Sequence, residues 1–140
     1  MKITELMIGD WVHDTREPFN NPVKLTGINA HQINESDPIC FLENEEGLGL
    51  TRRLSELKPI PLTVDILEKN EFVRCGEDSL YPQYNDCTHR FSDNRGHVVL
   101  LEYIGWSHGY YNVHDITTIH DVHELQHIFK IKKIKREIVL

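Results

Sequence analysis

Two prolines, Pro59 and Pro61, divide the 140-residue chain into parts with different hydrophobic patterns. Proline fixes its own φ angle, lacks a backbone N–H and restrains the preceding residue to extended conformations. Segment 58–62 is therefore unsuited to a helix or a central strand, and we expect an extended joint there. The joint predicts a small β unit over residues 1–58 and an α+β unit over residues 59–140, either as two lobes or as one compact domain.

The first part of the chain contains short segments rich in β-forming residues. Residues 23–28 alternate between apolar and polar side chains, and the acidic turn 43–47 separates two apolar segments. Four or five short strands at this spacing are typical of a small curled sheet. We therefore expect an SH3-like β-barrel or roll, with strands near residues 8–12, 23–28, 39–42 and 48–50.

The second part combines strands with two helices. Thr63 is a suitable N-cap for a helix over residues 64–70. Hydrophobic spacing predicts a second helix over residues 119–130, where Asp121 and Glu124 form a capping-box-like pair. We expect an α+β fold in which this part is a mixed β-sheet carrying the two helices, with strands near residues 72–75, 80–84, 88–92, 97–103 and 137–140.

The run His123-Glu124-Leu125-Gln126-His127 matches the zinc-metalloprotease pattern H-E-x-x-H. On a helix the two histidines share a face and can bind one zinc ion, and the glutamate can activate a zinc-bound water. The sequence contains no other motif that is chemically specific. One alternative function is therefore a zinc-dependent hydrolase, with His123 and His127 as ligands and Glu124 as the base.

Two features of the sequence disfavour this metal site. A catalytic zinc needs three protein ligands, and the only side-chain carboxylate after His127 is that of Glu137. On a helical wheel the apolar residues share one face, while His120, His123 and His127 lie on roughly the opposite face. We therefore expect solvent-exposed histidines, no catalytic residue, and no bound metal or other cofactor.

Segment 105–111 places three aromatic residues and a histidine beside two glycines. Aromatic side chains on loops are common in recognition surfaces. They also bury large areas in turns that pack on their own sheet, so both interpretations stay open. The candidate binding surface consists of Trp106, His108, Tyr110 and Tyr111.

The chain carries a formal net charge of −7. General nucleic-acid binding needs a positive surface, so this charge disfavours a nucleic-acid partner. A local exception is the basic run from Lys130 to Arg136. The run follows a predicted helix, whose negative end favours cations, and it leaves a nucleic-acid accessory factor as a second alternative.

Cysteine usage indicates a reducing compartment. Cys40, Cys75 and Cys87 are odd in number and include no C-x-x-C pair. The N-terminus has no apolar run of signal-peptide length, and no segment approaches the roughly 20 apolar residues of a membrane span. We therefore expect a cytoplasmic protein without a membrane partner.

Three stretches of the chain, residues 2–12, 57–67 and 122–126, follow a recurring pattern. They resemble K-I-x-E-L-x-I-G-[ND]-[WY]-V, x-P-I-P-L-T-x-x-x-L and V-H-x-L-Q, in that order, of a family of small uncharacterised proteins. The family is found in Bacteroides-type gut bacteria, often near prophages and mobile elements. The resemblance covers most of the chain and implies a bacterial cytoplasmic setting, but no activity.

The resemblance also bears on the zinc motif. The family pattern often has Gln at the position of Glu124 and Asn at that of His127, which disfavours a conserved metal site. The segment from Lys132 to Arg136 departs from the family's ending, which has a glycine and a closing strand. We expect a non-enzymatic binding or adaptor module whose partner is a protein.

Overall fold

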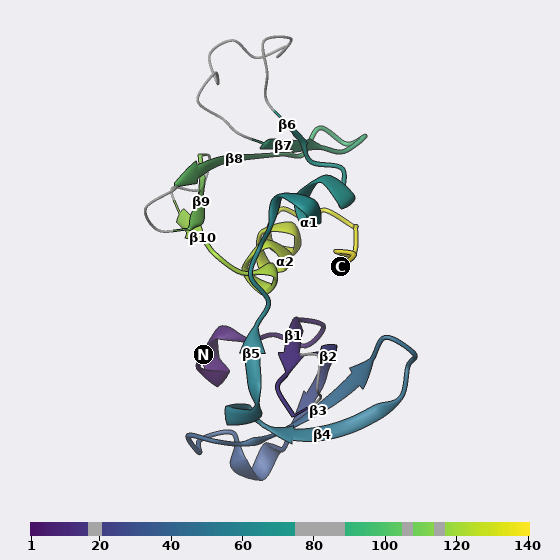
Figure 1. The fold of residues 1–140 in the computed structure, drawn as a ribbon, viewed down its shortest axis with the longest axis vertical. Coiled ribbons are helices and arrows are strands. Elements are labelled where there is room, and N and C mark those ends of the chain that lie inside the picture. The colour runs from purple at the N-terminus through teal and green to yellow at the C-terminus, as the bar shows by residue number, and fades with distance from the viewer. Residues whose placement is uncertain (17–20, 75–88, 105–107, 114–116) are drawn as a thin grey trace. The chain divides into compact units, whose positions relative to one another are not determined.

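The computed structural model describes residues 1–140 except for 17–20, 75–88, 105–107 and 114–116 (Figure 1). The chain divides into two compact units, Met1–Ile60 and Pro61–Leu140. The division falls inside the joint expected around the two prolines. Each unit contains one sheet, and both helices belong to the second unit, so the predicted α+β class is confirmed.

The first unit is a five-stranded sheet in which every pairing is antiparallel. The strand order is β4-β3-β2-β1-β5, so the chain returns to pair its last strand with its first. Three short 3₁₀ helices accompany the strands: η1 (Ile3–Glu5), η2 (Ala30–Gln32) and η3 (Leu54–Glu56). The strands are β1 (Trp11–Asp14), β2 (Asn21–Ile28), β3 (Ile39–Asn44), β4 (Gly49–Arg53) and β5 (Leu57–Pro59).

Alternation along the strands places the core of this unit on one face of the sheet. β2 buries Val23 and Leu25, and β3 buries Cys40 and Leu42, with polar or exposed residues between them. The free thiol of Cys40 is buried, and this burial raises its pKa. The core cluster consists of Leu6, Val12, Val23, Leu25, Cys40, Leu42, Leu54 and Leu57.

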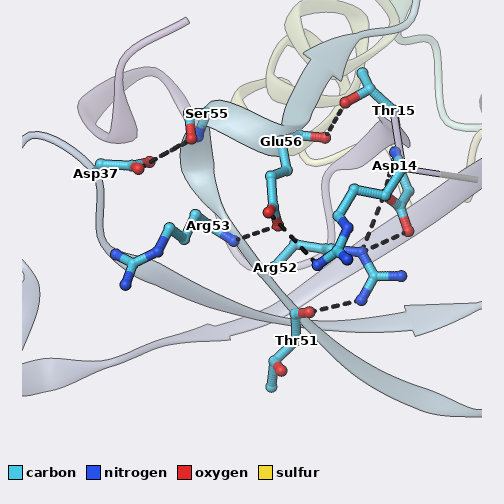
Figure 2. Close-up of polar contacts among 9 residues, drawn as sticks. Asp14, Thr15, Asp37, Thr51, Arg52, Arg53, Ser55 and Glu56 are labelled. Atoms are coloured by element: carbon cyan, nitrogen blue, oxygen red, sulfur yellow. Dashed lines mark hydrogen bonds and ion pairs between the residues drawn. The ribbon is translucent and has the colours of Figure 1, made fainter.

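An ion pair between Asp14 on β1 and Arg52 on β4 shows that this sheet curls. Two strands lie between β1 and β4, so a flat sheet would separate them by about 14 Å. The Nε atom of Arg52 nevertheless lies 3.1 Å from Oδ1 and 3.0 Å from Oδ2 of Asp14 (Figure 2). The described strands still leave β4 and β5 at the two edges of the sheet, and no closed barrel is seen among them.

The second unit contains a five-stranded antiparallel meander with the order β10-β9-β8-β7-β6. A mixed sheet was expected, but every pairing between the described strands is antiparallel. β6, β7 and β8 lie where strands were expected, near 72–75, 88–92 and 97–103. β9 and β10 were not predicted, and the strand expected at 80–84 lies outside the described residues. The strands are β6 (Val73–Arg74), β7 (His89–Ser92), β8 (Val98–Ile104), β9 (Gly109–Asn112) and β10 (Thr117–Ile119).

The two helices are α1 (Val64–Lys69) and α2 (Val122–Ile131). Thr63 caps α1 as predicted, since its hydroxyl accepts a hydrogen bond from the backbone N–H of Ile66 at 3.3 Å. The start predicted for the second helix at residue 119 is wrong, because residues 117–119 pair with β9 as strand β10. Within the described residues, neither helix has the length and apolar character that crossing a membrane requires.

Three phenylalanines join the helices to the sheet of the second unit. The ring centre of Phe91 on β7 lies 4.9 Å from that of Phe129 on α2 and 5.4 Å from that of Phe72, which follows α1. All three side chains are almost completely buried. This cluster holds both helix C-termini against strand β7.

The closing strand predicted at 137–140 is wrong. These residues alternate in burial as a strand would, but they pair with none of the described strands. The buried side chain of Asn70 instead bonds the backbone of Val139: its Nδ2 donates to the carbonyl oxygen at 2.6 Å, and its Oδ1 accepts from the N–H at 2.7 Å. The side-chain amide of Asn70 thus supplies the two backbone hydrogen bonds that a neighbouring strand would otherwise form with Val139.

Candidate ligand-binding cleft

The carboxylate of Glu124 is held at the N-terminus of α2. Its Oε1 atom accepts hydrogen bonds from the backbone N–H groups of His120, at 3.0 Å, and Asp121, at 3.2 Å. These bonds satisfy backbone donors near the helix start, so the predicted capping pair of Asp121 and Glu124 is confirmed. The residue that a hydrolase would use as a base therefore has a structural role.

The prediction that the motif histidines face solvent is wrong for His123. This residue is only 5% exposed, and its Nδ1 atom has no hydrogen-bond partner among the described residues. The helix begins at Val122, and its buried residues are Val122, His123, Leu125, Ile128 and Phe129. Its buried face is therefore wider than the apolar stripe that the helical wheel indicates.

The described residues do not complete the site that H-E-x-x-H requires. The ring centres of His123 and His127 lie 5.7 Å apart, and the rings are inclined at 71°. The ligand atoms that gather within 4.8 Å of one another belong instead to Asp121, His123 and Glu124. This group includes the capping carboxylate and omits His127, so it differs from the site of a zinc protease.

The candidate aromatic surface is divided between core and solvent. Tyr110 lies on β9, is 3% exposed and packs against Tyr103, with ring centres 5.4 Å apart. Burial raises the pKa of the Tyr110 hydroxyl. Tyr111 is half-buried and His108 is exposed, while Trp106 lies outside the described residues. Tyr110 therefore contributes to the core and not to a contact surface.

A different group of side chains gathers where the two helices of the second unit end. Each helix is followed by a residue in the left-handed region, Glu71 with φ 66° and Lys133 with φ 58°. This conformation lets the next N–H bond back into the helix. Phe72 and Ile134 accordingly donate to carbonyl oxygens five residues earlier, at 3.0 and 2.8 Å. Phe72 and Ile134 are buried in the core, and their charged neighbours Glu71, Lys133 and Lys135 are exposed to solvent.

The turn between β7 and β8 is organised by Asp93. Its Oδ1 atom accepts hydrogen bonds from the N–H groups of Arg95, at 2.9 Å, and His97, at 2.8 Å, and its Oδ2 lies 2.7 Å from Nδ1 of His97. Burial acts to raise the pKa of the Asp93 carboxyl, but these hydrogen bonds outweigh it and hold the pKa below its usual value. The carboxylate is therefore charged and committed to the turn.

A cleft of about 290 Å³ is bordered by this turn and by the segments that follow the two helices. Arg136 donates a hydrogen bond to the carboxylate of Glu71, and its guanidinium carbon lies 5.5 Å from the ring centre of Phe91. Phe91 is 1% exposed, so its ring is held in the core under the Arg136 guanidinium. The lining residues are Glu71, residues 91–95 and residues 134–136.

Two cations of this cleft have no partner in the described structure. The side chains of Arg95 and Lys135 line the cleft and form neither an ion pair nor a hydrogen bond with any described residue. The cleft contains one more cation, Arg136, and two carboxylates, Glu71 and Asp93, both of which are already engaged. A site with free positive charge therefore exists in a chain whose net charge is −7.

Sequence reasoning identified only part of this cleft. The basic run that ends at Arg136 was assigned to a helix end, and strands were expected on both sides of residues 93–96. Neither observation indicated that Arg95 and Phe91 line the same cleft as Lys135. The one available signal was a charged residue at the second position after each helix, Glu71 and Lys133, where glycine is usual.

Comparison of the chain with known protein families, curated proteins and solved structures finds no match. The functional interpretation therefore depends on the geometry of the described residues.

Proposed function

We propose that the chain is a non-enzymatic binding module that recognises an acidic segment of a protein partner in the cleft of its second unit. The observation that carries this proposal is the pair of cations, Arg95 and Lys135, that line one cleft and have no partner among the described residues. Guanidinium and ammonium groups form charge-assisted hydrogen bonds with carboxylates. An acidic segment can place successive carboxylates against both cations.

The same geometry argues against the hydrolase alternative. Glu124 accepts two backbone hydrogen bonds at the start of α2, and His123 is packed into the core side of that helix. A metal-bound water would need both groups turned toward one open coordination position. The capping role accounts for Glu124 without any chemistry.

We also propose that the curled sheet of the first unit is of the SH3-like type, because β5 returns to pair with β1 and the 3₁₀ helix η3 lies between β4 and β5. The contact from Arg52 to Asp14 supports the curl. Such small β units host many functions, so the first unit by itself does not identify a partner. The odd number of cysteines and the buried free thiol of Cys40 favour a cytoplasmic setting.

The test is binding of a fluorescently labelled, end-capped oligoglutamate peptide, followed by anisotropy at about 0.1 M salt. A double variant, Arg95→Gln with Lys135→Gln, should weaken binding by about three- to tenfold, since each exposed charge contribution is small. The matched control is Arg53→Gln with Lys58→Gln, which removes the same two charges from exposed positions of the first unit.

Equal losses in both double variants would mean that only net charge matters, and the cleft assignment would be wrong. Oligoglutamine should not bind. Tighter binding of single-stranded DNA than of oligoglutamate, lost in the Arg95→Gln/Lys135→Gln variant, would favour the nucleic-acid alternative instead.

A further inference from the structure

One cation of the cleft, Arg136, is already paired with a carboxylate of the same chain. Glu71, the second residue after α1, forms an ion pair with it. Both ends of this pair remain partly in contact with water, with 66% of the Glu71 side chain and 39% of the Arg136 side chain exposed. An exposed ion pair of this kind contributes little stability and exchanges readily with solvent.

Arg136 has a second contact that does not depend on Glu71. Its guanidinium lies over the face of Phe91, at 5.5 Å from the ring centre. A cation in this position is attracted by the aromatic ring, and Phe91 is fixed in the core between Phe72 and Phe129. Release of Glu71 should therefore leave Arg136 at the wall of the cleft and free to bind another carboxylate.

We propose that Glu71 is an internal competitor that occupies Arg136 in the free protein, and that a carboxylate of the acidic ligand displaces it. This inference rests on the function proposed above and adds a third binding cation to Arg95 and Lys135. Glu71 then sets both the affinity and the selectivity of the cleft. A ligand can bind Arg136 only when it presents a carboxylate that replaces the carboxylate of Glu71.

The left-handed conformation of Glu71 is consistent with this role. A φ angle of 66° is unusual for glutamate and common for glycine or asparagine at the end of a helix. Glycine would close the helix with less strain, but it could not reach Arg136. The side chain at this position is therefore explained by the ion pair and not by the backbone.

The decisive experiment is a double-mutant cycle between Glu71→Gln and Arg136→Gln, measured with capped oligoglutamate. Glutamine removes the charge of each side chain and leaves a polar amide in its place, and the melting temperature of each variant reports whether it folds. Glu71→Gln alone should tighten binding by about two- to fivefold, the range expected for one exposed ion pair. In the Arg136→Gln background the same substitution should have no effect, because the cation that it releases is absent.

An equal gain in both backgrounds would show that Glu71 acts only through its negative charge, and unchanged binding in Glu71→Gln would show that it does not act on the ligand. Either result overturns the competition while leaving the cleft as the binding site. Failure of the native protein to bind oligoglutamate at all contradicts the proposed function itself.

Discussion

The side chain of Asn70 forms two hydrogen bonds with the backbone of Val139, although 69 residues separate them in the sequence. A further bond links its Nδ2 to the carbonyl oxygen of Ile66 at 2.7 Å. Asn70 is 3% exposed, so these bonds form away from water. They fix the C-terminal segment, which positions residues 134–136 at the cleft.

Replacing Asn70 by alanine should therefore destabilise the second unit by about 1–3 kcal/mol, because backbone groups lose their partners in a buried environment. Chemical denaturation measures this change. The control is Lys69→Ala: its ammonium donates to the carbonyl oxygen of Leu140 at an exposed position, so its loss should cost less than about 0.5 kcal/mol. Similar costs for both variants would show that Asn70 does not anchor the C-terminal segment.

Arg52→Gln should be among the most destabilising surface-accessible changes in the first unit. It leaves the fully buried carboxylate of Asp14 without its cation, and breaking such a pair costs about 3–5 kcal/mol. The lower end is expected because 18% of the Arg52 side chain is exposed. The neighbouring Arg53→Gln changes an exposed side chain on the same strand and should lie within about 0.5 kcal/mol of the native protein. Urea unfolding of the two variants makes the comparison, and equal stabilities would mean that the ion pair does not hold the curled sheet.

Stability should fall as the pH falls below about 6.5, in part because of His89. Burial lowers the pKa of His89, and the Glu68 carboxylate, 3.6 Å from its Nε2 atom, only partly offsets this. The folded protein therefore keeps the imidazole neutral where the unfolded chain binds a proton, so acid favours unfolding. His89→Gln should flatten the dependence by at most about 1.4 kcal/mol per pH unit. Denaturation across this pH range tests the sign, and an unchanged slope in the variant would refute it.

Burial likewise lowers the pKa of His13 in the first unit. His13→Gln is therefore the matched comparison for His89→Gln. Each substitution should remove a separate share of the acid sensitivity, because the two histidines belong to different units.

Two substitutions of Glu124 separate capping from catalysis. Glutamine keeps an oxygen that can accept the backbone hydrogen bonds, so Glu124→Gln should change stability by less than about 0.5 kcal/mol. Alanine removes the acceptor and should cost about 0.5–2 kcal/mol. A zinc hydrolase would respond differently: it would contain stoichiometric zinc and lose peptide hydrolysis in Glu124→Gln. Metal analysis and a peptidase assay of the purified protein distinguish the two accounts.

Local signals predicted much of this fold. Thr63 and Asp121 are polar residues directly before apolar helical spacing, and both are N-caps. The turn around Gly96 sits between residues 88–92 and 97–103, which were expected as strands and form β7 and β8. These features depend only on neighbouring residues, so the sequence alone was sufficient for them.

Features that depend on distant residues were missed. Residues 137–140 have the sequence pattern of a strand, but a strand also needs a sheet edge with which to pair. The backbone of Val139 bonds the side chain of Asn70 instead. His123 looks solvent-facing on a helical wheel, yet its burial depends on what covers that side of α2. The cleft joins three segments distant in the sequence, Glu71, 91–95 and 134–136, so no local pattern could show that they meet.

The most direct test of the account is to map where an acidic peptide binds. Backbone amide NMR shifts of the isotopically labelled protein should be recorded during titration with capped oligoglutamate. Binding in the cleft predicts the largest shifts at Glu71, residues 91–95 and residues 134–136, with little change in the first unit. Shifts confined to residues 1–60, or no shifts at all under conditions where the native protein is folded, would contradict the assignment of this cleft as the binding site.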